Sequence, residues 1–284
     1  MAIKFKSLSY VYDYGMPYAH KAVDSIDLAI REGVITAVIG ETGSGKSTMV
    51  EHLNALLLPT EGELEVLDYN IIANEKTKGL KNLRKQVGLV FQFSEYQLFE
   101  ETVIKDVAFG PKNFGMSEEE ATKKAMMALK LVGLDESYYE LSPLELSGGQ
   151  KRRVAIAGIL ASEPKVIVLD EPTAGLDPRG AKDMINLFVE LNKKFKTTVI
   201  IVSHDNEMVY NYCEDVVVMK KGKVGFHGKT VDLFWDNKML EDFNLLEPQI
   251  VTFKKYLMEK GFELKKEDRT IEAIAKRVAK EVNR

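Results

Sequence analysis

The chain has 284 residues, of which 45% are hydrophobic and 29% charged, a balance typical of folded globular proteins and unlike that of disordered ones. Its net charge of −4 argues against a nucleic-acid-binding protein, because such proteins usually present a basic face to the phosphates. The single cysteine, Cys213, excludes a disulfide framework within the chain and indicates a reducing compartment. We expect it to be a small buried apolar residue.

The apolar segments are too short to cross a membrane. The best candidates, Val34–Ile39 and Thr198–Val202, have the length of strands and fall far short of the roughly 20 residues that span a bilayer. Residues 1–10, MAIKFKSLSY, lack the apolar region of a signal peptide. We therefore expect synthesis in the cytosol and contact with a membrane only through partner proteins.

The first third of the chain begins with strands. Ile3–Leu8 and Ala22–Ile30 are expected strands on either side of a tyrosine-rich loop. Val34–Ile39 is a short, β-branched run between two glycines, which predicts a buried central strand. A glycine-rich turn follows, and then a predicted helix from Lys46 to about Leu57, ended by Pro59.

The middle of the chain is predicted to be mostly helical. Val87–Phe91 is a further short strand, and helical patterns run from there to about Gly158. Ser117 followed by Glu120 is the signature of a capping box, which starts a helix that we expect to end at Gly133.

The last third alternates strands and helices and then changes character. Predicted strands occupy Lys165–Asp170 and Thr197–Ser203, separated by a helix over Gly180–Lys194, and Val216–Lys220 pairs with Lys223–His227 in a hairpin. This alternation favours a mostly parallel sheet covered on both faces.

From Gly228 onward the chain is helical and charged. It carries an apolar stripe at helical spacing, formed by Ile271, Ile274, Ala275, Val278 and Val282. That stripe fits a helix that packs on its own domain as well as a tail that contacts a partner.

A phosphate-binding loop lies between the first buried strand and its helix. The residues from Gly40 to Ser47, GETGSGKS, match the pattern G-x-x-x-x-G-K-[ST] in full. Gly43 and Gly45 allow backbone N–H groups to turn toward phosphates, where side chains would block them. Lys46 offers a positive charge to the β- and γ-phosphates, and the Ser47 hydroxyl suits Mg²⁺.

Two carboxylates end a later strand. Asp170 and Glu171 follow four apolar residues and precede Pro172. A strand of this kind delivers them to the carboxyl edge of the sheet, where ligands bind in open α/β folds. Asp170 can belong to a Mg²⁺ shell, and Glu171 can accept a proton from an attacking water.

A second glycine-rich segment starts a helix. Leu146–Gln150, LSGGQ, precedes three basic residues and an apolar stretch, and two glycines at a helix start form another anion-binding nest. One nucleotide within one domain rarely needs two such nests, so we infer that this one faces the γ-phosphate held by a second subunit.

With these motifs in this order, the chain resembles the nucleotide-binding subunits of ABC transporters. The resemblance covers about residues 3–228 and implies an α/β fold, a P-loop NTPase of ABC type with a RecA-like core, an antiparallel β subdomain and a helical signature subdomain. ATP and Mg²⁺ are the implied cofactors. The intact LSGGQ segment and the retained Glu171 imply a subunit that hydrolyses ATP.

The family's site residues map onto this chain one by one. Implied nucleotide contacts are the aromatic Tyr12, which has other tyrosines nearby, and the loop residues Gly40, Thr42, Gly43, Ser44, Gly45, Lys46, Ser47 and Thr48. The signature residues Ser147, Gly148, Gly149 and Gln150, together with Asp177 of the D-loop, are implied to act across a dimer. The implied catalytic residues are Glu171, His204, Lys46 and Gln92, and the implied metal ligands are Ser47, Gln92 and Asp170. Asp177 also suits a simple helix cap.

Residues 91–111 resemble a narrower group, the ATPases of energy-coupling factor (ECF) vitamin transporters and of the related cobalt and nickel importers. The Gly15-Met-Pro17 insertion looks like the second of the two ATPase subunits in such complexes. The resemblance implies an ATPase domain over 1–228, with its helical signature part at about 93–160, and a helical extension over 229–284 through which subunits associate.

The implied partners are an identical or paralogous ATPase in a head-to-tail dimer, a transmembrane coupling subunit and a substrate-binding membrane subunit, with no nucleic acid. The implied location is peripheral, on the cytoplasmic side of the cell membrane. Soluble ABC ATPases of DNA repair or translation are less expected, because the interval from Lys46 to Ser147 lacks sustained heptads and only one set of motifs is present.

Overall fold

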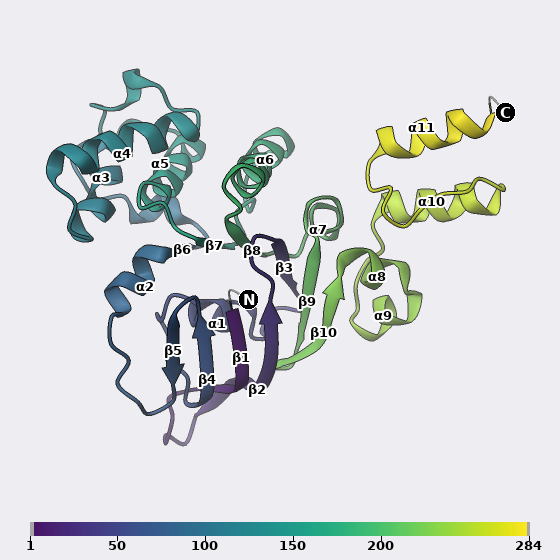
Figure 1. Cartoon of the computed structure of the whole chain (residues 1–284), viewed down its shortest axis with the longest axis horizontal. Helices are drawn as coiled ribbons and strands as arrows, with labels where there is room; N and C mark the ends of the chain where they lie inside the picture. Colours follow the sequence, from purple (N-terminus) through teal and green to yellow (C-terminus); the bar gives the residue numbers. More distant parts are fainter. Residues whose placement is uncertain (1–2, 283–284) are drawn as a thin grey trace.

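The computed structural model describes residues 3–282; Met1, Ala2, Asn283 and Arg284, at the outer bounds of the expected domains, lie outside the described residues. Two sheets and a group of helices form the body of the molecule, and four further helices follow at one side (Figure 1). This arrangement agrees with the predicted α/β class. No helix among the described residues is long and apolar enough to span a membrane.

The central sheet has six strands in the order β10-β9-β3-β8-β7-β6. All neighbours are parallel except β9 and β10, which form an antiparallel hairpin at one edge. The strands are β3 (Ile35–Ile39), β6 (Val87–Val90), β7 (Val166–Asp170), β8 (Thr198–Val202), β9 (Asp215–Lys220) and β10 (Lys223–Lys229). The parallel strands β3, β6, β7, β8 and β9 are buried on both faces, which explains why they are mostly apolar runs in the sequence, whereas the edge strand β10 is polar and partly exposed.

The second sheet is antiparallel and has the order β2-β1-β4-β5. Its strands are β1 (Ile3–Tyr12), β2 (His20–Ile30), β4 (Glu61–Val66) and β5 (Tyr69–Ile72). The short helix α1 (Lys46–Glu51) shares one apolar cluster with this sheet and with one face of the central sheet, through residues such as Met49, Phe5 and Val38. The phosphate loop is therefore anchored between two sheets.

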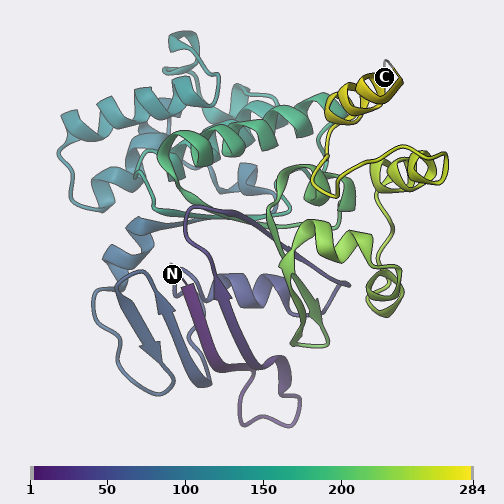
Figure 2. The same ribbon diagram turned by 45° about the vertical axis from the view of Figure 1, so that its right-hand side comes forward.

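The opposite face of the central sheet is covered by helices (Figure 2). After α2 (Leu80–Gln86) come α3 (Val103–Asn113), α4 (Glu118–Leu131) and α5 (Gly148–Leu160), with α6 (Pro178–Phe195) beside them. The predicted capping box is present: the Ser117 hydroxyl accepts from the Glu120 N–H, and the Glu120 carboxylate accepts from the Ser117 N–H. Gly133 follows the helix in the left-handed conformation, as expected.

The chain ends with α7 (Asn206–Tyr212), α8 (Thr230–Trp235), α9 (Asn237–Asp242), α10 (Gln249–Glu259) and α11 (Ile271–Val282). α8 adds Leu233 and Phe234 to the core of the central sheet. The later helices are bonded to α7 and its end. The donors and acceptors are Asn206 Nδ2 to Leu246 O, Gln249 N to Glu207 Oε1, Tyr210 Oη to Lys266 O, Lys254 Nζ to Tyr210 Oη and Arg269 Nη1 to Cys213 O.

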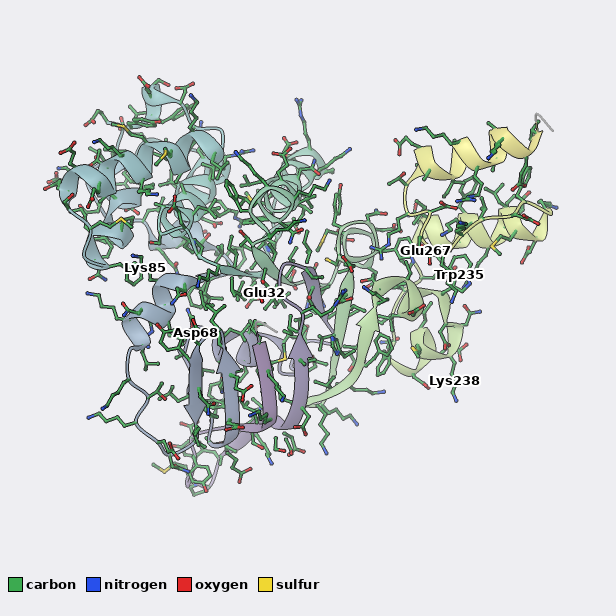
Figure 3. All side chains as sticks on the ribbon, in the orientation of Figure 1. Glu32, Asp68, Lys85, Trp235, Lys238 and Glu267 are labelled. Carbon is green, nitrogen blue, oxygen red and sulfur yellow. The ribbon has the colours of Figure 1, made fainter. Side chains whose placement is uncertain are left out.

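Lys254 is the central buried contact of this region. Its ammonium is fully buried, donates to the Lys266 carbonyl at 2.8 Å and lies 4.8 Å from the centre of the Trp235 ring. Trp235 is labelled where α8 meets the later helices (Figure 3). Burial lowers the pKa of Lys254 to about 8, with Asp268 and Glu267 opposing that shift. Cys213 is also buried, as expected.

Two local expectations were wrong. The helix after the phosphate loop ends at Glu51, not near Leu57, and the chain continues in turns in which Ala55 adopts a left-handed conformation. The sequence pattern predicts no element over residues 61–86, which form β4, β5 and α2. β4 reads EGELEV, and its glutamates obscure the alternation of buried Leu64 and Val66.

Candidate functional site

The phosphate loop is shaped by glycines that tolerate no side chain. Gly40 and Gly45 have φ of +140° and +98°, and a Cβ at these positions would lie 2.1 Å from Met219 O and 2.4 Å from Ala22 O. Gly43 also has a positive φ, but the space beside it is open. Gly40 and Gly45 therefore let the loop pack closely against Met219 and Ala22, while Gly43 leaves room for a ligand.

Lys46 is buried inside this loop. Its ammonium donates to Gly40 O at 2.9 Å and to Glu41 O at 3.0 Å. Burial lowers its pKa, and the carboxylates of Glu171 and Asp170 oppose that shift. A lysine that faces carboxylates and is held by loop carbonyls is placed to exchange those carbonyls for phosphate oxygens.

The carboxylates stand at the carboxyl end of β7, as the strand pattern predicts. Burial raises the pKa of Asp170, whereas the Ser47 hydroxyl and Lys46 lower it. Glu171 takes a left-handed conformation with φ of 49°, and its N–H bonds to Val202 O at 3.1 Å. This backbone turn fixes Glu171 at the sheet edge beside the end of β8.

Glu171 and His204 face each other. Glu171 Oε1 lies 3.4 Å from His204 Nε2, and this buried oxygen has no hydrogen-bond partner among the described residues. Burial and the neighbouring Asp170 raise the pKa of Glu171. Burial and then Lys46 lower the pKa of His204, whose side chain is 51% exposed. The pair thus combines a carboxylate of increased basicity with an accessible imidazole.

One cavity of about 450 Å³ joins most of these groups. Its lining includes ten of the residues named from the sequence, namely Thr42, Gly43, Gly45, Lys46, Ser47, Thr48, Gln92, Asp170, Glu171 and His204. The Ser47 hydroxyl, the Gln92 amide and the Asp170 carboxylate supply oxygens of the kind that Mg²⁺ prefers. Within residues 3–282 no group of three or more His, Cys, Asp or Glu side chains is placed to hold a metal ion.

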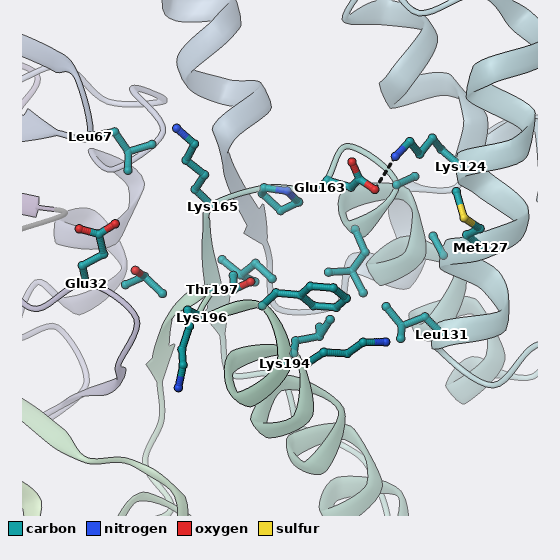
Figure 4. Close-up of a pocket in the computed structure, with 18 residues that line it drawn as sticks. Glu32, Leu67, Lys124, Met127, Leu131, Glu163, Lys165, Lys194, Lys196 and Thr197 are labelled. Atoms are coloured by element: carbon teal, nitrogen blue, oxygen red, sulfur yellow. Dashed lines mark hydrogen bonds and ion pairs between the residues drawn. The ribbon is translucent and has the colours of Figure 1, made fainter.

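A larger cavity, of about 760 Å³, lies elsewhere (Figure 4). Its lining includes Lys165 and Thr197, which precede β7 and β8, so it opens at the amino end of the parallel strands. Leu131 and Met127 of α4 also line it. This cavity lies at the opposite end of the parallel strands from the phosphate loop. The cavity beside the phosphate loop is therefore the smaller of the two.

Tyr12 lies outside the lining of the smaller cavity but beside it. Its hydroxyl is 3.2 Å from the Thr48 hydroxyl, and its ring is 36% exposed at the end of β1. Gly40 and Ser44 also lie outside the lining, as parts of the loop's inner side. An exposed aromatic ring next to a phosphate loop can stack on a base.

The LSGGQ segment is separate from this cavity. Ser147 caps α5 in a capping box with Gln150: the Ser147 N–H donates to Gln150 Oε1 at 2.8 Å, and the Ser147 hydroxyl accepts from the Gln150 N–H. Gly148 and Gly149 are exposed, and a Cβ on either would meet nothing within 4 Å. The signature surface is thus open and can receive a ligand held by another molecule.

Asp177 acts as a helix cap in this structure. Its carboxylate accepts from the N–H groups of Arg179 and Gly180, both at 3.0 Å, at the start of α6. These backbone bonds lower its pKa. Asp177 is exposed, which leaves it accessible to a second subunit. Its contact across a dimer stays a prediction.

Arg152 was missed by sequence reasoning. It is buried on α5, pairs with Glu95 at 2.9 Å and donates to Ala174 O at 2.6 Å. It therefore links three segments: the turn after Gln92, the signature helix and the stretch after Glu171. The run of three basic residues after LSGGQ was the available signal, but nothing in the sequence separates the buried arginine from its neighbours.

Comparison with known proteins agrees with this geometry. The chain matches the family model described as ABC transporter over residues 23–174. It is 47% identical over 282 residues to the energy-coupling factor transporter ATP-binding protein EcfA2 of Enterococcus faecalis, covering 99% of this chain and 98% of the relative. It is 51% identical over 260 residues to the EcfA2 of Ligilactobacillus salivarius, covering 92% and 90%.

Solved structures give the same result. The cbiO1 protein of Clostridium perfringens, described as part of the ABC transporter complex cbiONQ, has a TM-score of 0.73 and 39% identity, covering 89% of this chain and 98% of that one. The ATP-binding cassette MJ0796, described as a dimer in a post-hydrolysis state bound to ADP and Pi, has a TM-score of 0.71 and 33% identity, covering 80% and 98%. The chain belongs to the ATP-binding proteins of the ABC transporter family, and within them to the energy-coupling factor branch.

Proposed function

We propose that the chain binds ATP on the loop Gly40–Thr48 and hydrolyses it as the ATPase subunit of an ECF-type importer for vitamins or other micronutrients. One observation carries this proposal above all. Lys46, Asp170, Glu171 and His204 reach a single cavity from three different segments, in the arrangement that phosphoryl transfer to water requires.

The site is proposed to be half of a composite chamber. The exposed nest at Ser147–Gly149 offers N–H groups to an anion but lies outside the cavity of its own chain. Two subunits, identical or paralogous, would therefore sandwich ATP head to tail, with Gln150 and Asp177 near the same junction. Closure would exclude bulk water and strengthen each electrostatic contact around the γ-phosphate.

Within the chamber each residue has a proposed task. Lys46 holds phosphate oxygens. Ser47, Gln92 and Asp170 would hold a Mg²⁺ ion brought by the nucleotide, which would supply positive charge beside the phosphates. Glu171 orients the attacking water and accepts its proton, a task favoured by the raised pKa of this half-buried carboxyl. His204 donates to the γ-phosphate as charge develops.

Exposed apolar surfaces support the proposed partners. Phe93, Tyr96 and Phe99 are exposed in the segment after Gln92, and Phe99 packs edge-to-face on the exposed Phe109 of α3; we assign this surface to a transmembrane coupling subunit. A substrate-binding membrane subunit would join the complex through that coupling subunit. The chain would then lie on the cytoplasmic side of the cell membrane without entering it.

We propose the same organisation as the sequence predicts, with an ATPase domain to residue 228 and an association region from 229. Support comes from α11, where Ile271 and Val282 are 69% and 68% exposed while Ile274 is buried. One side of the apolar stripe packs inward, and the other is available to a second subunit. The cobalt or nickel importer is not favoured, because the curated relatives cited above are named as ECF proteins.

The test of hydrolysis is Glu171→Gln in the full chain. Loss of a general base removes about 10²–10⁴ in rate, while ATP affinity should persist because phosphate contacts are retained. Glu190→Gln, which neutralises an exposed carboxylate on α6, is the matched control. Near-normal turnover of Glu171→Gln would remove Glu171 from this role.

The test of the partners is purification of the native complex with gentle detergent. Membrane proteins should accompany the chain in a fixed ratio. Recovery with DNA or ribosomes, and without membrane proteins, would contradict the importer.

A further inference from the structure

His52 is a fully buried histidine at the end of α1, the helix that follows the phosphate loop. Its Nδ1 lies 2.7 Å from the Thr48 carbonyl. A carbonyl only accepts, so Nδ1 carries the proton and Nε2 is a bare acceptor. Nε2 is buried without a hydrogen-bond partner among the described residues. A leucine would fill this space without bringing in a ring nitrogen that has no partner, so packing alone does not account for the imidazole.

The ring replaces a main-chain donor. In a continuous α-helix the His52 N–H would bond to Thr48 O, four residues earlier. Here that N–H points to Val50 O, because α1 ends at this turn. The imidazole supplies the missing donor and thereby keeps the last turn around Thr48 in place.

The His52 ring is also connected, through Tyr10, to Tyr12, the tyrosine predicted to contact the base. Tyr10 packs edge-to-face on His52, with ring centres 5.1 Å apart, and edge-to-face on Tyr12, with centres 4.8 Å apart. The Tyr12 hydroxyl returns to the Thr48 hydroxyl at 3.2 Å. The four residues His52, Tyr10, Tyr12 and Thr48 thus form a closed circuit that joins β1 to α1.

We propose that His52 and Tyr10 are positioning residues that fix the Tyr12 ring relative to the phosphate loop, so that the adenine base is held at the correct distance from the phosphates. This inference rests on the proposed function, because it takes ATP as the ligand and Tyr12 as the stacking ring. Neither positioning residue needs to touch the nucleotide. His52 has no exposed surface, and the circuit acts only through Tyr12 and Thr48.

A purely structural role makes a different prediction. If His52 only stabilised the core, its loss would weaken all ligands of the loop together or lower thermal stability alone. If it positions Tyr12, its loss weakens ligands that carry the base and leaves base-free ligands unaffected. The informative quantity is therefore the ratio of the dissociation constants of inorganic tripolyphosphate and ATP.

The experiment measures both constants for the full chain, by competition against a fluorescent ATP analogue. His52→Leu should lower the ratio about three- to tenfold, the range for losing an edge-to-face aromatic contact at tenfold per 1.4 kcal/mol. Tripolyphosphate affinity should not change. His52→Asn places an amide N–H close to the position of Nδ1, so it should recover part of the ratio.

Three further variants distinguish the proposal from general damage to the fold. Tyr10→Leu breaks the circuit without altering α1 and should lower the ratio like His52→Leu, while Tyr10→Phe keeps the ring and should restore it. Val50→Ala removes buried volume from α1 outside the circuit and should leave the ratio unchanged.

The outcomes separate this inference from the function on which it rests. If Tyr12→Leu leaves the ratio unchanged, the base does not stack on Tyr12 and that part of the proposed function fails. If Tyr12→Leu lowers the ratio but His52→Leu and Tyr10→Leu do not, the positioning circuit alone is overturned. A ratio lowered equally by Val50→Ala would also overturn it.

Discussion

The buried imidazole of His52 gives a quantitative prediction that needs no nucleotide. Burial lowers its pKa from the ordinary 6.5 to about 4, although the bond to the Thr48 carbonyl opposes the shift. Because the folded-state pKa is depressed, the unfolded chain binds this proton more readily wherever the pH lies between the two values. The stabilisation is complete above pH 6.5 and is lost as the pH falls toward 4.

The size of the effect follows from these two values. At pH 5 the unfolded histidine is almost fully protonated and the folded one almost fully neutral, which removes about 2 kcal/mol from the free energy of unfolding. At pH 7 the same group removes almost nothing. His52→Leu abolishes this proton linkage, so its stability should fall less on acidification.

The assay is urea unfolding of the unaltered chain and of His52→Leu at pH 7 and pH 5. All other titrating groups are common to both proteins, including Glu51, whose pKa is raised by burial and by Asp170. The change between the two pH values should therefore differ by about 2 kcal/mol. Identical pH dependence would show that the imidazole is protonated in the folded chain, contrary to the reasoning.

Three other predictions concern the phosphate loop, the Arg152 ion pair and the last helix. Gly45→Ala should lower the thermal midpoint more than Gly43→Ala, because both positions have positive φ but only the first would bring a Cβ within 2.4 Å of a backbone oxygen; equal losses would contradict this. Arg152→Ala leaves the Glu95 carboxylate without its partner and should cost about 3–5 kcal/mol in urea unfolding, whereas a cost below about 1 kcal/mol would contradict a structural ion pair. Ile271→Glu should weaken subunit association in sedimentation experiments at unchanged monomer stability, and undiminished association would place the contact elsewhere.

The sequence predicted the central sheet well because those strands are buried on both faces. β3, β7 and β8 each appear as short, mostly apolar runs bounded by glycine or polar residues, and such runs have few other stable placements. β4 and β5 were not predicted, because their solvent side carries glutamate and asparagine and only alternate residues are buried. Local pattern was insufficient where the partner strand, β1, lies more than fifty residues away.

The site residues also divide into those that the sequence predicted and those that it did not. Residues such as Lys46 and Asp170 were found because each lies in a contiguous motif whose chemistry is readable in a few letters. His52, Tyr10 and Arg152 were missed, since their roles arise from contacts between segments. The pairing of Arg152 with Glu95 spans 57 positions, and no spacing rule anticipates it.

The connections between α7 and the later helices have a mechanical consequence. α7 begins two residues after His204, with Asp205 as its cap, and Asn206, Glu207 and Tyr210 all bond to residues beyond Leu245. The His204 loop and the segment that contains Leu246, Gln249 and Lys266 are therefore both attached to α7. Because Gln249 and Lys254 of α10 bond directly to Glu207 and Tyr210 of α7, a displacement of α10 would be passed to the helix that starts beside His204.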